Sequence, residues 1–168
     1  MGAVLIEVAD AVSDALNGHD FGIPFTAQRS YADWNDELAD LAEVKVDVVP
    51  FRSVPDLDSV GTYEIPVTID ILIRKHFDYS DQDSDQTIPN EIIDPLIKLV
   101  QDVWEFFAPS QANGAHTGRL TLTSGLSAAW DSDNPARVMA DYVRPHLRKM
   151  RQFTGWIRVG YVVSKEPD

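Results

Sequence analysis

A long stretch of alternating residues, 62–77 (TYEIPVTIDILIRKHF), constrains the fold of this chain more than any other feature. Its odd positions are apolar from Tyr63 to Ile73, whereas its even positions are mostly polar or charged. A period of two held over this length predicts a long β-strand with one face on a core and one toward water. Pro66 cannot donate to a strand ladder, so a bulge or an edge position is expected there.

Helices are expected to cover the apolar face of this strand. Apolar residues recur at helical spacing in 3–17, where Glu7 is expected on the polar side, and again in 89–107. The second helix has two candidate starts, one near Pro89 and one with Asp94-Pro95 as N-cap and first position. We favour the earlier start, with Pro95 tolerated near the beginning.

Further strands are expected to pair with the long one. The first two, with the long strand, should form an antiparallel meander in which Pro50 ends or caps the second element. Residues 125–134 are expected to form a turn-rich connection, and 135–150 short helical or irregular structure broken near Pro145. The segments with strand patterns are 26–32, 43–51, 116–124 and 151–164.

These elements predict one α+β domain over residues 1–168. Its mostly antiparallel sheet has about four to five strands, and two main helices pack on one face. The absence of cysteine excludes disulfides, a thiol nucleophile and cysteine metal sites. No signal peptide is visible and no apolar run approaches membrane-spanning length, so a soluble protein that does not engage a membrane is expected.

The net charge of −13 is unevenly distributed along the chain. Residues 1–94 contain 5 basic and 20 acidic residues, whereas residues 95–168 contain 9 basic and 7 acidic residues. Such an acidic chain is poorly suited to wrapping nucleic acid. Copies packed head to tail could set an acidic part against a basic part, and Arg144, Arg148 and Arg151 are candidate contacts. The alternative is a solvated acidic surface.

The sequence contains no motif that predicts a catalytic, cofactor or metal site. Asp81, Asp83 and Asp85 resemble the start of a calcium loop, but Gln86 stands where glycine is needed and Ile92 where glutamate is needed. The four histidines lack metal-ligand spacing, and neither a nucleophile elbow nor a phosphate-binding loop is present. We therefore expect no catalytic residue, no cofactor, no metal and no enzymatic function.

The four tryptophans differ in their expected surroundings. Trp104 falls on the apolar stripe of the second helix and is expected in the core. Trp34 and Trp130 fall in expected loops, and Trp156 falls on the more polar face of the last strand. Exposed tryptophans are frequent interface anchors. Partial burial under neighbouring loops is the alternative for these three.

Nearly the whole chain resembles the tail terminator and tail-completion proteins of tailed bacteriophages. The resemblance is carried by VLIEVADAVSDALN, FTAQRSY, VKVDVVP, IPVTIDILIRKHF and RQFTGWIRVGYVV, and by the Asp-rich loop before an apolar helix. It implies a virion structural protein, assembled in the host cytoplasm, that forms a homo-oligomeric, six-membered ring. The ring would cap the tail tube protein, meet the head-tail connector or adaptor, and let DNA pass without specific binding.

The acidic loop 78–87 is the first candidate for a tip that contacts neighbours or lines the channel of such a ring. Its candidate residues are Asp78, Asp81, Asp83 and Asp85, where a negative lumen would repel DNA. Within the same class, a head-tail adaptor or a minor tail protein is the alternative. From other classes, a small hydrolytic enzyme and a cellular binding module stay open.

Overall fold

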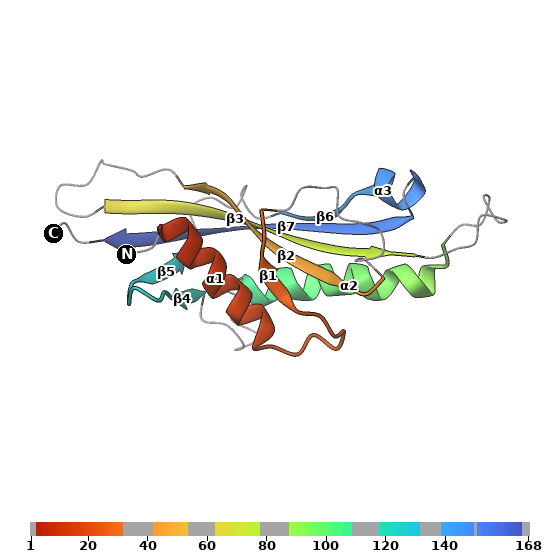
Figure 1. Ribbon diagram of the computed structural model, residues 1–168, viewed down its shortest axis with the longest axis horizontal. Helices are drawn as coiled ribbons and strands as arrows, with labels where there is room; N and C mark the ends of the chain where they lie inside the picture. The colour runs from red at the N-terminus through yellow and green to blue at the C-terminus, as the bar shows by residue number, and fades with distance from the viewer. Residues whose placement is uncertain are drawn as a thin grey trace.

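The computed structural model describes residues 3–31, 42–53, 63–77, 88–108, 118–131, 139–149 and 151–165. Within these ranges the chain forms an α+β fold with three helices and a seven-stranded sheet (Figure 1). The helices are α1 (Val4–Asn17), α2 (Asn90–Phe107) and α3 (Arg144–Lys149). The strands are β1 (Ala27–Arg29), β2 (Lys45–Ser53), β3 (Tyr63–His76), β4 (Arg119–Thr121), β5 (Ser127–Trp130), β6 (Met139–Tyr142) and β7 (Gln152–Lys165).

The two longest strands, β3 and β7, form the centre of the sheet. They pair antiparallel along their full length, from Tyr63 opposite Lys165 to His76 opposite Gln152. The strand order is β1-β2-β3-β7-β5-β4, and β6 also pairs with β7. Strands β5 and β6 therefore share the second edge of β7, with β6 beside residues 155–158 and β5 beside residues 161–163.

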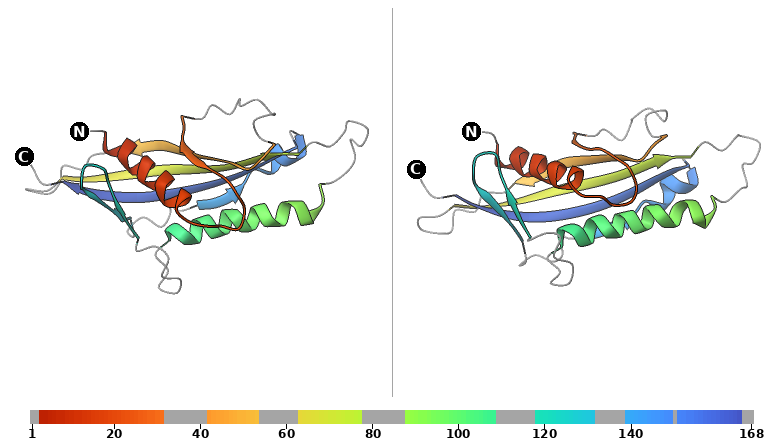
Figure 2. Two further views of the ribbon diagram at one scale, coloured as in Figure 1. Left: turned by 60° about the horizontal axis from the view of Figure 1, so that its bottom comes forward. Right: turned by 90° about the horizontal axis from the view of Figure 1, so that it is seen from below.

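One face of the sheet forms the hydrophobic core with α1 and α2 (Figure 2). The odd positions of β3 and β7 lie on this face because a strand turns alternate side chains to opposite sides. Helix α1 packs on β1, β2 and β3, and α2 packs on β7 and β6. The fully buried side chains on this face include Val46, Val48, Ile69, Ile71, Ile73, Phe153, Ile157, Val159 and Tyr161.

Gly155 sets how closely α2 approaches the sheet. A Cβ atom placed on Gly155 would lie 2.3 Å from Val100 Cγ2 of α2. Such a separation is far below van der Waals contact, so a larger residue here would force the helix or the Val100 side chain to move. Glycine in the strand is therefore explained by close packing.

The opposite face, which we call the outer face, was expected to face water, and that expectation is wrong for the middle of β3. Thr68, Asp70, Leu72 and Arg74 are all 9% exposed or less. Helix α3 lies on this side, above the sheet in Figure 1, and His146 Nδ1 is 3.0 Å from Thr154 Oγ1. Polar side chains on this face are thus buried and must find partners.

The expected fold class and both long helices are confirmed. Helix α2 begins at Asn90 and contains Pro95, so the earlier of the two starts is the observed one. The bulge or edge position expected at Pro66 stays a prediction, because the part of the chain that would follow β2 beside it lies outside the described residues. Pro66 lies opposite Val162 of β7, whereas the described pairing with β2 ends at Val67.

Several expected details are wrong. Strand β1 pairs parallel to β2, so the first three strands are not an antiparallel meander. Pro50 does not end β2, because a register shift between Pro50 and Arg52 accommodates it and the strand continues to Ser53. Residues 125–134, expected to be a turn-rich connection, contain β5, and residues 135–150 contain β6, so the sheet has more strands than expected. The short helix α3 in 135–150 agrees with the short helical structure expected there.

Glu7 was expected on the solvent side of the first helix, and the structure corrects this as well. Its side chain is 7% exposed, and its Oε2 accepts a hydrogen bond of 3.1 Å from the backbone N–H of Ser124. The hairpin of β4 and β5 packs against α1 at this point, which removes Glu7 from water. Trp104 is partly buried and packs against the core, as expected.

Candidate functional site

Two ion pairs lie within the outer face. Asp47 on β2 pairs with Arg74 on β3, and their side chains are 0% and 1% exposed. Asp70 on β3 pairs with Arg158, the residue opposite it on β7. A buried charge without a partner is costly, so each pair lowers the free-energy cost of placing its two charges within the sheet. The two pairs therefore join the three central strands on the face that α1 and α2 leave uncovered.

The guanidinium group of Arg158 binds a carboxylate and lies beside two aromatic rings. Its Nε and Nη2 donate hydrogen bonds of 2.7 and 2.8 Å to the two carboxylate oxygens of Asp70. Its guanidinium carbon lies 3.9 Å from the ring centroid of Phe51 and 4.7 Å from that of Trp156. The hydrogen bond to Asp70 raises the pKa of Arg158, against an opposing effect of burial. Arg158 is therefore a positioned, permanent cation.

A cavity of about 400 Å³ opens beside this cluster, and we call it the outer groove. Apolar and aromatic side chains dominate its walls, and the Asp70–Arg158 pair supplies its charge. Arginine has more N–H donors than the two that Asp70 accepts, so further donors remain for a carbonyl or carboxylate. The residues that define the outer groove are Val49, Phe51, Asp70, Leu72, Val143, Trp156 and Arg158.

The outer groove is better suited to binding a partner molecule than to acid–base catalysis. Both oxygens of Asp70 accept hydrogen bonds from the guanidinium of Arg158, so the carboxylate already has a partner within the protein. In the described part of the chain, no three His, Asp or Glu side chains are grouped closely enough to hold a metal ion. A fixed cation between aromatic walls is instead typical of an interface anchor.

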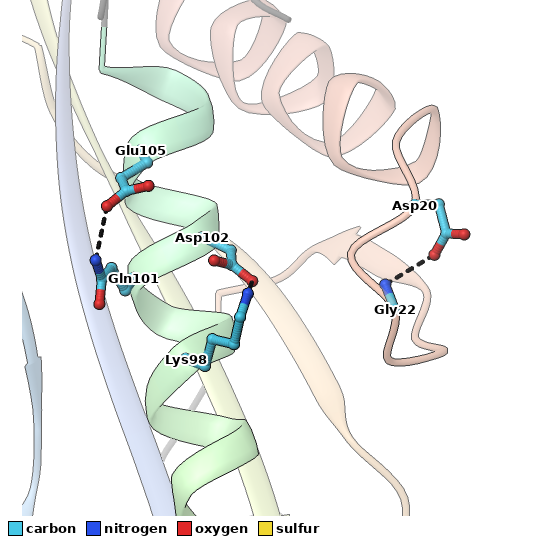
Figure 3. Close-up of polar contacts among 6 residues, drawn as sticks. All are labelled: Asp20, Gly22, Lys98, Gln101, Asp102 and Glu105. Atoms are coloured by element: carbon cyan, nitrogen blue, oxygen red, sulfur yellow. Dashed lines mark hydrogen bonds and ion pairs between the residues drawn. The ribbon is translucent and has the colours of Figure 1, made fainter. Parts of the chain in front are cut away.

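The outer surface of α2 contains two side-chain pairs in its C-terminal half. Lys98 pairs with Asp102, and Gln101 Nε2 donates a hydrogen bond of 2.7 Å to Glu105 Oε1 (Figure 3). Residues four apart lie above one another on a helix, so these contacts are local. The ion pair neutralises the carboxylate of Asp102, and the hydrogen bond gives the carboxylate of Glu105 a partner.

The N-terminal half of α2 differs, and we call its exposed residues Glu91, Ile92, Asp94 and Ile97 the acidic patch. Neither carboxylate has a basic partner within the described ranges. Ile92 and Ile97 are each 38% exposed, which is high for isoleucine. Acidic and apolar groups are therefore both exposed on this half of the helix, and no described residue of opposite charge pairs with the acidic ones.

An aromatic cluster lies where the loop after α1 meets the end of α2. His19 stacks on Phe106 with ring centroids 4.7 Å apart, and Phe21 meets both rings edge-on. Asp20 Oδ1 accepts a hydrogen bond of 2.8 Å from the backbone N–H of Gly22 (Figure 3), whose φ is +76°. These contacts fix the loop and explain the glycine. We interpret the cluster as structural.

The structure separates the tryptophans and arginines that the sequence marked as interface candidates. Trp156 lines the outer groove. Trp130 is the last residue of β5 and is not in a loop; its ring meets Tyr161 edge-on at 5.9 Å, so it packs against the core. Arg144 is exposed at the start of α3, with its guanidinium carbon 5.9 Å from the Tyr142 ring centroid.

Arg151 has a backbone role. Its φ of +48° lies in the left-handed region, which is uncommon for residues other than glycine. Its carbonyl accepts a hydrogen bond of 3.0 Å from the N–H of Phe77, at the point where the chain enters β7. Arg148 belongs to α3, and its side chain lies outside the described part of the structure. The other candidates lie outside the described residues altogether: Trp34, Asp78, Asp81, Asp83 and Asp85.

Sequence reasoning missed the residues that form the outer groove. Asp70 falls among the even, polar positions of the stretch 62–77, but the sequence does not reveal its pairing with Arg158, 88 residues further along the chain. Phe51 was taken for the end of a strand. Pro50 is the signal that could have pointed to it, because a proline within a strand pattern can mark a bulge, and bulges redirect side chains.

A comparison with models of known protein families finds no match, and neither does a comparison with curated protein sequences.

Proposed function

We propose that this protein is a virion structural protein of the tail terminator type. In this role, copies associate into a ring that caps the phage tail tube and forms part of the head-tail interface. Its partners are other copies of itself, the tail tube protein and the head-tail connector. The proposal assigns the protein no catalytic role and no cofactor, and rests on the sequence resemblance together with the surface described above.

The observation that carries the proposal is the outer groove. Phe51 is 53% exposed, yet its ring is held against the guanidinium of Arg158, which Asp70 fixes in turn. Aromatic and arginine side chains that are rigid before binding lose little entropy in a complex, which favours them as interface anchors. A protein whose function is assembly needs such surfaces.

The charge of the chain supports passage of DNA without specific binding. With a net charge of −13, the protein offers little neutralisation of phosphates. Within the described ranges, no helix has both the length and the apolar character needed to cross a bilayer. We further propose the virion neck as the location of the mature protein, after assembly in the host cytoplasm.

A head-tail adaptor or minor tail protein is the second candidate within this class, since the same surface would serve it. The volume of the outer groove, about 400 Å³, also favours a small-ligand binding module as a candidate from another class. A ligand that raises the melting temperature of a monomeric protein and loses this effect in Trp156→Ala would favour that module.

The test is negative-stain imaging of the purified protein, alone and mixed with tail tubes of the phage that encodes it. The terminator proposal expects rings, or density that caps one end of each tube. Trp156→Ala should reduce capping, whereas Tyr31→Ala, which removes a 69% exposed aromatic outside the outer groove, should not. A protein that ignores tubes but binds purified connectors would replace the terminator proposal with the adaptor.

A further inference from the structure

We infer that the outer groove of one copy receives the acidic patch of a second copy. This inference rests on the proposed function, which requires copies of the chain to associate, and it specifies which two surfaces meet. The contact joins two different surfaces, so each copy can offer its acidic patch to one neighbour and its outer groove to another. Contacts of this heterologous kind generate rings when the rotation closes and filaments when it does not.

The first argument is the position of exposed apolar side chains. The large hydrophobic residues that are exposed in the described part of the chain are Tyr31, Phe51, Ile92 and Ile97. Three of these four belong to the two surfaces: Phe51 to the outer groove, and both isoleucines to the acidic patch. Exposed apolar groups that gather in this way mark contact sites.

The second argument is charge. Arg52 follows Phe51 and Arg144 follows Val143, so an exposed arginine adjoins each of two lining residues of the outer groove. Neither arginine has a carboxylate partner within the described ranges. Glu91 and Asp94 of the acidic patch likewise lack basic partners there. Two cations and two anions, none of which has an oppositely charged partner among the described residues, are complementary between copies.

The third argument is the arrangement of the two surfaces on the fold. The acidic patch lies on α2, which covers the core-forming face of the sheet (Figure 1). The outer groove is lined by residues of the other face. Two surfaces on opposite sides of the sheet cannot contact each other within one chain. They also favour a chain of copies over a closed two-fold dimer, in which the same patch would meet itself.

The groove can accommodate the contact sterically. Its volume of about 400 Å³ is sufficient for an isoleucine side chain, and its walls include Val49, Leu72 and Trp156. The remaining N–H donors of Arg158 would face the incoming helix. Asp94 lies one turn before Lys98, on the part of α2 whose carboxylates have no partner within the helix.

The test uses two charge-reversed proteins, Glu91→Lys/Asp94→Lys and Arg52→Glu/Arg144→Glu, in sedimentation velocity experiments against wild type. Each alone should associate at least about tenfold more weakly, because like charges would then meet. An equimolar mixture of the two should recover association, since the two reversed surfaces are complementary to each other and the two unchanged surfaces are complementary as before. Higher salt should weaken the wild-type assembly.

The matched control is Asp14→Lys, which makes the same reversal at an exposed position of α1 and should leave association unchanged. Circular dichroism and thermal unfolding of each variant confirm that it folds. A wild-type protein that stays monomeric at the highest reachable concentration overturns the inference, as do reversed variants that associate like wild type or a mixture that fails to recover.

The outcomes for this inference and for the proposed function can be told apart. Recovery in the mixture without any capping of tail tubes would support the contact and overturn the terminator proposal. Tube capping that survives both charge reversals would support the terminator proposal and overturn the contact.

Discussion

Asp47 and Arg74 form an ion pair that is shielded from water on the face opposite the two long helices. Their side chains are 0% and 1% exposed, and they come from neighbouring strands, β2 and β3. Asp47 lies opposite Leu72 and Arg74 lies opposite Lys45, so the pair runs diagonally across the two strands. The face of the sheet that the alternating pattern predicts to be exposed to water is therefore, in its middle, a second and partly polar interior.

Removing one member of this pair should strongly destabilise the protein. Asp47→Leu leaves the guanidinium of Arg74 buried without its carboxylate, and we expect a loss of about 3–5 kcal/mol in the free energy of unfolding. The double variant Asp47→Leu/Arg74→Met should recover most of this loss, because it removes both charges of the pair. Urea denaturation measures all three proteins, and a double variant as unstable as the single one would contradict the explanation.

Gly155 should tolerate no larger residue while Val100 is present. Gly155→Ala places a methyl group 2.3 Å from Val100 Cγ2, and overpacking of this kind costs about 1–3 kcal/mol. Val100→Ala creates the space, so the double variant should be more stable than the sum of the two single effects predicts. Additive losses in a thermal unfolding cycle would show that the strand and helix do not meet at this point.

Tyr161 should make the protein sensitive to alkaline pH. Its side chain is 0% exposed, its hydroxyl has no hydrogen-bond partner among the described residues, and burial raises its pKa. The raised pKa means that the unfolded chain loses this proton first, at a pH of about 10. The contribution of Tyr161 to stability is therefore complete below pH ~10 and is lost as the pH rises further.

Tyr161→Phe should remove this part of the pH dependence. Near neutral pH the variant should be as stable as wild type, or more stable by about 1 kcal/mol, since a buried hydroxyl without a partner is costly. Chemical denaturation at several pH values above neutrality provides the measurement. Tyr31→Phe, at a residue 69% exposed, is the control and should follow wild type.

Asn17 should protect the edge of the sheet at β1. Its Nδ2 donates a hydrogen bond of 2.9 Å to the carbonyl of Ala27, and its Oδ1 accepts one of 2.8 Å from the N–H of the same residue. The amide thus occupies a position that another strand would otherwise use. Asn17→Ala should cost about 1–2 kcal/mol and promote aggregation. Light scattering and urea denaturation test both effects.

Asn17→Asp is the matched variant for this prediction. It keeps an acceptor for the N–H of Ala27 but loses the donor to the carbonyl, so its stability should fall between wild type and Asn17→Ala. Equal losses in the two variants would indicate that the residue acts only as the end of α1.

Local patterns in the sequence predicted most of the secondary structure. The alternation in 62–77 predicted β3 to within a residue at each end, and helical spacing predicted α1 and α2. Patterns of this kind depend on a residue and its near neighbours in the chain, which are visible in any sequence. The short strands β5 and β6 were not predicted, because four residues provide too little periodicity and the strands depend on pairing with β7.

The sequence by itself determined the long strand, the two long helices, the face that forms the core and the position of Trp156 on the other face. Only the tertiary structure decided that β1 runs parallel to β2, that the outer face is buried around Arg74, and that Phe51 meets Arg158. These features arise from contacts between residues far apart in the chain; Asp70 and Arg158, for example, are separated by 88 positions. The partner of a charged side chain depends on strand order and register, which no local period contains.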